Sequence, residues 1–117
     1  MNTDGDAHSK RERGRRSEER FLALFRDSAK APDWLDRIER AKTKGARGED
    51  IDFFVFSKDG KKTPVNIKSS HAGKLGFVRK HGPDTVCIIV MEDDQDDDAM
   101  RTESVFSLER WRARKAP

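Results

Sequence analysis

The feature that most constrains the fold is a pair of apolar segments joined by a polar turn. The segments are Ile51-Asp-Phe-Phe-Val-Phe56 and Thr63-Pro-Val-Asn-Ile-Lys-Ser-Ser70, with Ser-Lys-Asp-Gly-Lys-Lys between them. Such runs around an Asp-Gly pair predict two antiparallel strands. Alternate side chains of a strand point to opposite faces, so Asn66 and Lys68 share one face. Burying polar groups on an apolar sheet is costly, which indicates that a function requires them.

The length of the turn decides whether Asp52 joins this polar face. A three-residue loop, 58–60, with Gly60 at positive φ, places Asp52 opposite Asn66 on the same face. A two-residue Asp-Gly turn is also chemically allowed, and it places Asp52 opposite Ile67 on the other face. We favour the three-residue loop, because glycine in its third position meets the need for positive φ. Oxygen ligands beside a lysine suit a hard cation and a phosphate.

Composition bounds the size and setting of the protein. The chain has 117 residues, of which 33% are hydrophobic and 40% charged, so we expect one domain with a small core. No window is long and apolar enough to span a membrane, and the N-terminus has no apolar signal-like run, so we expect a cytoplasmic protein. The single cysteine, Cys87, lies in the apolar run 86–91, where it is expected to be buried.

Charge is distributed unevenly. Residues 58–80 contain seven Lys or Arg and one Asp, whereas residues 92–98 contain six acidic residues. A basic segment around the polar face indicates an anionic partner, with nucleic acid first, although an ordinary solvated surface is the alternative.

The remaining pattern predicts an α/β fold. Residues 1–13 have no apolar pattern and are interpreted as a flexible basic arm, followed by one domain over 14–117. A helix is expected from about residue 15 to residue 29. Its buried stripe is formed by Phe21, Leu22, Phe25 and Ala29. Residues 33–44 are ambiguous between helix and strand, and we favour a strand over about 37–42.

After the hairpin, a crossover helix around 74–80 should lead to a strand over 85–91 that is parallel to the second hairpin strand and connected with right-handed topology. The acidic run is expected to be a loop, residues 103–106 a short final strand, and Ser107 the cap of a terminal helix. Together these elements predict a mixed sheet of four to five strands, flanked by helices on both faces.

Several of these residues occur in a known pattern. Gly14-x-x-x-Glu18 on a helix, Asp52 in an apolar strand and Asn66-x-Lys68 on the next strand resemble the PD-(D/E)xK nuclease superfamily, and the run 65–70 is similar to the end of the catalytic strand in several small members. The resemblance implies a restriction-endonuclease-like fold and hydrolysis of phosphodiester bonds in DNA with Mg²⁺, or with Mn²⁺ as the alternative metal.

The resemblance also implies roles for individual residues. Asp52, Glu18 and Asn66 would hold the metal, with Glu49 or Asp50 as alternative carboxylates, and Lys68 would position or activate the attacking water. The chain departs from the family at residue 66, where Asp or Glu is usual, so the metal would be held by fewer negative charges.

A second set of residues follows the catalytic strand and could contact DNA. We expect this set to comprise Ser69, Ser70, Lys74, Arg79 and Lys80. Ser70 has an alternative role as a helix cap, which we favour. Small proteins of the superfamily often dimerise, so we expect a homodimer. The alternatives to a nuclease are a nucleic-acid-binding module that has lost its chemistry at Asn66, and a protein-interaction or regulatory domain. Trp34 and Trp111 are expected in the core or at a dimer interface.

Overall fold

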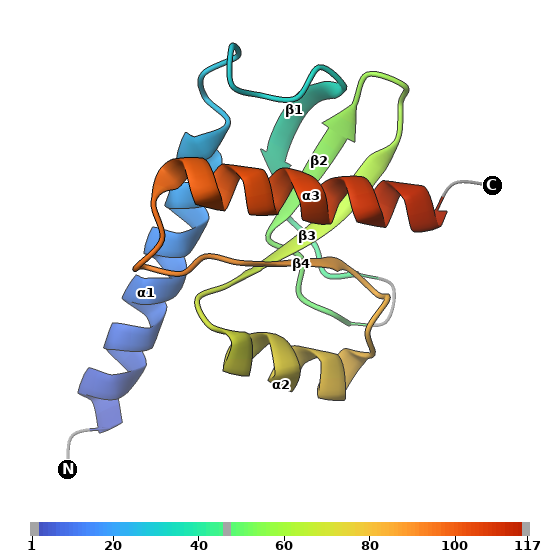
Figure 1. Ribbon diagram of the computed structural model, residues 1–117. Coiled ribbons are helices and arrows are strands. Elements are labelled where there is room, and N and C mark those ends of the chain that lie inside the picture. Colours follow the sequence, from blue (N-terminus) through green and yellow to red (C-terminus); the bar gives the residue numbers. More distant parts are fainter. Residues whose placement is uncertain (1–2, 46–47, 116–117) are drawn as a thin grey trace.

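The computed structural model describes residues 3–45 and 48–115, which form one layer of sheet and three helices (Figure 1). In chain order the elements are α1 (Thr3–Leu24), β1 (Leu35–Arg40), β2 (Phe53–Ser57), β3 (Lys62–Lys68), α2 (His71–His81), β4 (Cys87–Val90) and α3 (Asp97–Lys115). The four strands lie in the order β1-β2-β3-β4. The first two pairings are antiparallel and the third, between β3 and β4, is parallel. The predicted α/β class with a mixed, four-stranded sheet is therefore confirmed.

The register of the hairpin confirms the three-residue loop. Phe53 pairs with Val65 and Phe56 with Lys62. The N–H of Ser57 donates to the carbonyl of Lys61 over 2.9 Å, which leaves residues 58–60 as the loop. Gly60 has φ of 88°, a left-handed conformation in which a side chain would be strained. Continuing the same register by one residue brings position 52 level with position 66.

The hydrophobic core lies between one face of the sheet and the helices α1 and α3. Figure 1 shows α3 crossing the strands and α1 running down one side of the molecule. The sheet contributes alternate residues such as Val55 and Val65, α1 contributes Phe21, and α3 contributes Leu108 and Trp111. The rings of Phe21 and Phe53 lie 5.4 Å apart between their centroids. Apolar side chains that alternate along the strands thus meet helical stripes, which is the packing that the sequence pattern predicts.

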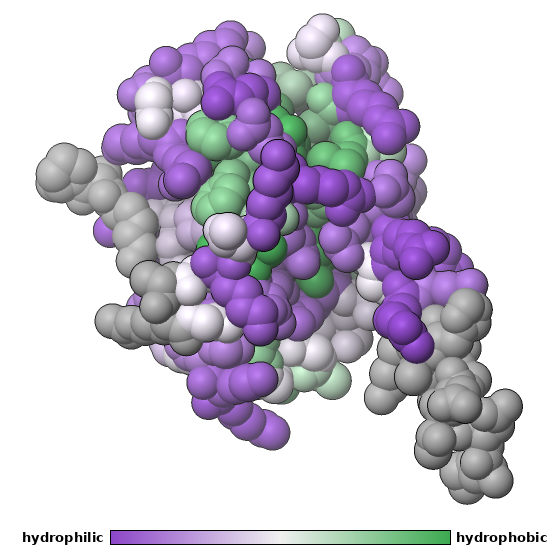
Figure 2. All heavy atoms as spheres, turned by 180° about the vertical axis from the view of Figure 1, so that it is seen from behind, coloured by the Kyte–Doolittle hydropathy of each residue, from purple (hydrophilic) through white to green (hydrophobic). Residues whose placement is uncertain are grey.

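The opposite side of the sheet is more open. Figure 2, viewed from behind, shows apolar side chains reaching the surface between hydrophilic ones. Phe54 and Phe56 alternate with the buried residues of β2 and are only partly buried. Cations cover both rings: Lys62 Nζ lies 4.4 Å from the centroid of Phe54, and Arg37 Cζ lies 4.0 Å from that of Phe56. Helix α2 contacts β3 and β4 and buries Phe77. Coverage of both faces by helices stays a prediction.

The first helix differs from its predicted bounds. It begins at Thr3 rather than near residue 15 and ends at Leu24, so Ala29 lies outside it and is exposed. The segment over 3–13 lacks an apolar stripe, but Arg, Glu and Lys have high helix propensity, and this suffices to extend a helix whose C-terminal half is packed. The mobility of this basic segment stays a prediction.

The C-terminal region also differs. Residues 103–106, predicted as a strand, lie inside α3, and Ser107 lies in the middle of that helix rather than at its start. The cap is Asp96, whose Oδ1 accepts from the N–H of Ala99 over 2.8 Å. Two of the acidic residues expected in a loop, Asp97 and Asp98, form the first turn, where the helix dipole favours negative charge. The helical spacing of the buried residues Met100, Ser104, Leu108 and Trp111 explains why a helix forms here.

Three other predictions are confirmed. The ambiguous segment forms a strand, β1, although it begins at Leu35; the crossover helix is α2; and β4 is parallel to β3. Cys87 is buried, and burial raises the pKa of its thiol to about 12, so it acts as a small apolar residue. None of the helices in the described ranges has the length and apolarity needed to cross a membrane.

Candidate metal centre

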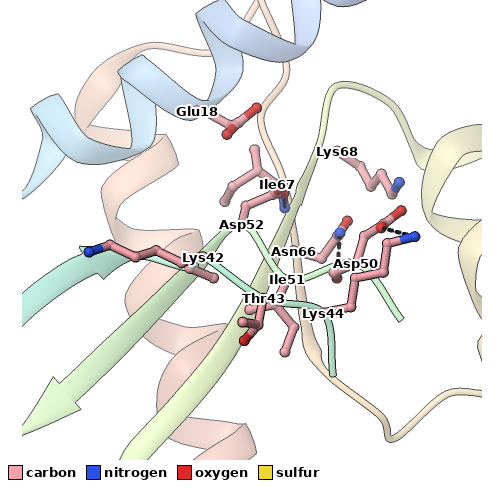
Figure 3. Close-up of a pocket in the computed structure, with 11 residues that line it drawn as sticks. Glu18, Lys42, Thr43, Lys44, Asp50, Ile51, Asp52, Asn66, Ile67 and Lys68 are labelled. Carbon is pink, nitrogen blue, oxygen red and sulfur yellow. Dashed lines mark hydrogen bonds and ion pairs between the residues drawn. The ribbon is translucent and has the colours of Figure 1, made fainter. Parts of the chain in front are cut away.

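A hollow of about 340 Å³ opens where β2 begins, β3 ends and α1 passes alongside (Figure 3). All four residues predicted to form the site line this hollow, although they come from three separate elements of the chain. They are Glu18, Asp52, Asn66 and Lys68. The acid at position 52 and the amine at position 68 therefore share one cavity, as the three-residue loop requires.

Asp52 is anchored by the backbone of β3. Its N–H donates to the carbonyl of Val65 over 2.8 Å, and its Oδ2 accepts from the N–H of Ile67 over 2.7 Å. Burial raises the pKa of the Asp52 carboxyl, while the Ile67 N–H and the charge of Lys68 oppose that increase. The carboxylate is therefore held in a fixed position in which its charge is incompletely compensated.

Asn66 provides the most unusual group in the hollow. Its side chain is 2% exposed, and its Nδ2 donates to the carbonyl of Asp50 over 2.9 Å. Its Oδ1 is buried and has no hydrogen-bond partner within the described part of the chain. A buried acceptor without a partner costs about 1–3 kcal/mol, so its retention in a small domain needs a reason. An amide oxygen is a ligand that Mg²⁺ accepts.

Glu18 reaches the hollow from α1. Its carboxylate pairs with Arg40, with Nη1 of the arginine 3.2 Å from Oε1 of the glutamate, and Arg40 also binds Glu19 over 2.6 Å. Burial and the negative charge of Asp52 raise the pKa of Glu18, whereas Arg40 lowers it. Because the charge of Asp52 disfavours ionisation of Glu18, a cation near both carboxylates would stabilise their charged forms.

Lys68 is the last residue of β3 and is half-buried. Its Nζ lies 5.1 Å from the ring centroid of Phe77, so the ammonium contacts α2 while its charge still acts on Asp52. The carbonyl of Lys68 accepts from the N–H of Met91 over 2.8 Å, which fixes this end of the strand against β4. The ammonium is thus placed at the rim of the hollow by both neighbouring elements.

The residues that directly follow β1 were not predicted to belong to the site. Lys42, Thr43 and Lys44 line the hollow, and Lys44 Nζ lies 3.7 Å from a carboxylate oxygen of Asp50. The basic residues Lys42 and Lys44, which follow β1, could have indicated that this segment borders the site. The sequence pattern instead predicted that the strand continues to residue 42. Of the two alternative carboxylates, Asp50 lines the hollow, whereas that of Glu49 is buried against Gly45.

The residues predicted to bind nucleic acid do not line the hollow. Ser69, Arg79 and Lys80 are exposed, and Lys74 borders two other depressions, beside β4. Ser70 caps α2, because its Oγ accepts from the N–H of Gly73 over 3.1 Å. The capping role that the sequence favoured is confirmed, while contact with nucleic acid stays a prediction for all five residues.

The donor set fits a magnesium ion with few protein ligands. Within residues 3–45 and 48–115, no three His, Cys, Asp or Glu side chains converge in a way that could hold a metal. The hollow instead offers the carboxylates of Glu18, Asp50 and Asp52, and it is also lined by Asn66, whose buried amide oxygen has no partner in the described part of the chain. Mg²⁺ commonly uses one or two carboxylates and keeps several waters, so this set meets its needs. In comparisons with protein-family models, curated proteins and solved structures, none matched this chain.

Proposed function

We propose that this protein is a Mg²⁺-dependent nuclease that hydrolyses phosphodiester bonds in DNA. The observation that carries the proposal is the buried, unpartnered Oδ1 of Asn66, a residue that lines one hollow with Asp52, Glu18 and Lys68. An amide oxygen, two carboxylates of raised pKa and an ammonium are the groups that metal-assisted phosphate chemistry uses. The order of elements, one helix, three antiparallel strands, a helix and a parallel strand, supports the restriction-endonuclease-like arrangement that the sequence resembles.

In this proposal Asp52, Glu18 and Asn66 hold the metal. Bound Mg²⁺ would polarise a phosphate oxygen and lower the pKa of a water molecule. The Ile67 N–H keeps the Asp52 carboxylate in place, so ligand geometry is set before the substrate arrives. The Lys68 ammonium offsets negative charge on the phosphate and orients the water. DNA as the substrate is supported by the basic residues over 58–80 and by Lys42 and Lys44 at the hollow.

The test is cleavage of single-stranded, duplex and branched DNA with Mg²⁺, Mn²⁺ or EDTA. We expect divalent-dependent cleavage that falls by a factor of about 100 or more in Asp52→Asn and in Lys68→Ala. Asp94→Asn is the matched control, because Asp94 is an exposed carboxylate in the loop before α3. Wild-type protein that folds but cleaves none of these substrates with either metal would reject the proposal.

The second candidate is a nucleic-acid-binding module, favoured by the neutral residue at position 66. The substitution Asn66→Asp separates the two. It adds the missing negative charge, so a module that has lost its chemistry should gain Mg²⁺-dependent cleavage, whereas an active nuclease should change little. A protein that shows no salt-dependent DNA affinity at all would instead favour the third candidate, a protein-interaction domain.

A further inference from the structure

Helix α3 presents an outward face with an unusual combination of groups. Phe106 is 58% exposed. Together with Leu75, it is one of two large hydrophobic residues that are exposed in the described part of the chain. Glu103 and Arg110 lie on the same face, because residues three, four and seven apart in a helix are neighbours. Ala99 and Ala113, both exposed, extend this face at its two ends. We call these five residues the α3 outer face.

A hollow of about 370 Å³ lies directly beside Phe106. Pro32, Val105 and Phe106 itself contribute apolar walls. The rest of the lining comes from Lys30, Arg101, Thr102 and Glu109. The exposed ring and the apolar hollow therefore form one continuous apolar area on this surface. A single exposed aromatic residue is ordinary, whereas a contiguous apolar area is typical of an interaction site.

The two charges on this face form no ion pair within the described residues. Neither the Glu103 carboxylate nor the Arg110 guanidinium forms an ion pair with any residue over 3–45 or 48–115, and Arg110 Cζ lies 5.6 Å from the ring centroid of Phe106. The two charges are opposite in sign and are separated by two helical turns, or about 10.5 Å along the axis. Phe106 lies close to the midpoint between them.

We propose that a second copy of this chain docks on the α3 outer face about a twofold axis that passes near Phe106. In an antiparallel pair of α3 helices, Glu103 of each copy meets Arg110 of the other. Each Phe106 ring reaches the hollow beside the other ring, and the small alanines allow the helix ends to approach. A twofold interface uses the same patch on both molecules, so a patch whose charges are complementary to themselves selects a second copy over an unrelated partner.

The first experiment is sedimentation velocity of the full chain between about 10 µM and about 1 mM. We expect a monomer–dimer equilibrium and no larger species, since a twofold interface closes on itself. Phe106→Ser should leave the protein folded, as judged by far-UV circular dichroism, and should weaken dimerisation by a factor of about ten or more. A wild-type protein that stays monomeric, open-ended oligomers, or unchanged association in Phe106→Ser would overturn the proposal.

A charge swap provides the more specific test. Glu103→Arg and Arg110→Glu each place like charges opposite one another, and each should weaken dimerisation by a factor of about ten. The double variant Glu103→Arg/Arg110→Glu recreates both pairs and should return to within a factor of about three of the wild type. Lys58→Glu, in the hairpin loop, is the matched control and should dimerise normally. A folded double variant that fails to recover excludes this geometry, whatever the outcome of the cleavage assays.

Discussion

Two neighbouring residues of β3, which point to opposite faces of the sheet, are almost equally buried but differ in what surrounds them. Val65 is 0% exposed and Asn66 is 2% exposed, although they are neighbours on one strand. Val65 packs in the main core with the side chains of α1, α3 and the other strands. Asn66 lines the hollow and has a buried amide oxygen without a partner among the described residues. Burial of the first stabilises the fold, whereas burial of the second costs free energy, so equal burial here distinguishes a structural position from one in the proposed site.

The largest effect we expect comes from placing the polar group on the wrong face. Val65→Asn buries an amide among apolar side chains and removes the packing of a fully buried valine. We expect the free energy of unfolding to fall by about 3–5 kcal/mol, measured by urea denaturation. A loss below about 1 kcal/mol would mean that the two faces are not as different as their surroundings indicate.

The converse substitution should act in the opposite direction. Asn66→Leu removes the unpartnered oxygen at the loss of one hydrogen bond to the Asp50 carbonyl, so we expect the free energy of unfolding to rise by about 1 kcal/mol. The same variant should lose the stabilisation that added Mg²⁺ gives the wild type in a thermal unfolding assay. Marked destabilisation by Asn66→Leu would show that the amide is there for structural reasons.

Ser70 is a polar residue that stabilises the fold, in contrast to Asn66. Its hydroxyl caps α2, so Ser70→Ala should lower the free energy of unfolding by about 1 kcal/mol. Ser70→Asp retains the cap and should restore stability. If Ser70→Ala abolished DNA cleavage while Ser70→Asp did not restore it, the serine would also belong to the site.

The smallest effect concerns pH. Asp52 and Glu18 have ordinary pKa values of 3.8 and 4.5, and both are raised in the folded protein. The folded state therefore binds these protons more tightly, and the resulting stability is fully present below the ordinary values and is lost as pH rises through the raised ones. Urea denaturation between about pH 4 and pH 7 should show a decline that is smaller in Asp52→Asn. Asp93→Asn, at an exposed carboxylate, is the control and should show the same decline as the wild type. If the decline were reduced equally in Asp93→Asn and Asp52→Asn, the pH dependence would not arise from Asp52.

Much of the site could be predicted because it depends on short-range rules. The alternation of side chains fixes Asn66 and Lys68 on one face, and Gly60 with its φ of 88° selects the loop that brings Asp52 level with them. The extents of α1 and α3 were not predictable in this way. The polar start of α1 has no apolar stripe, and the β-branched and aromatic residues around Val105 favour a strand locally, although Leu108 and Trp111 pack in a helix.

By itself, the sequence determined the hairpin, its register and the polar face of β3, because side-chain alternation and loop geometry act over a few residues. Only the tertiary structure decided that Arg40 pairs with Glu18 beside Asp52, that Lys42 and Lys44 border the hollow, and that Glu49 is turned away. Those placements depend on how α1 packs against β3 and how the β1–β2 connection closes over the strand ends. Such contacts join residues that are far apart in the chain, and no local pattern specifies them.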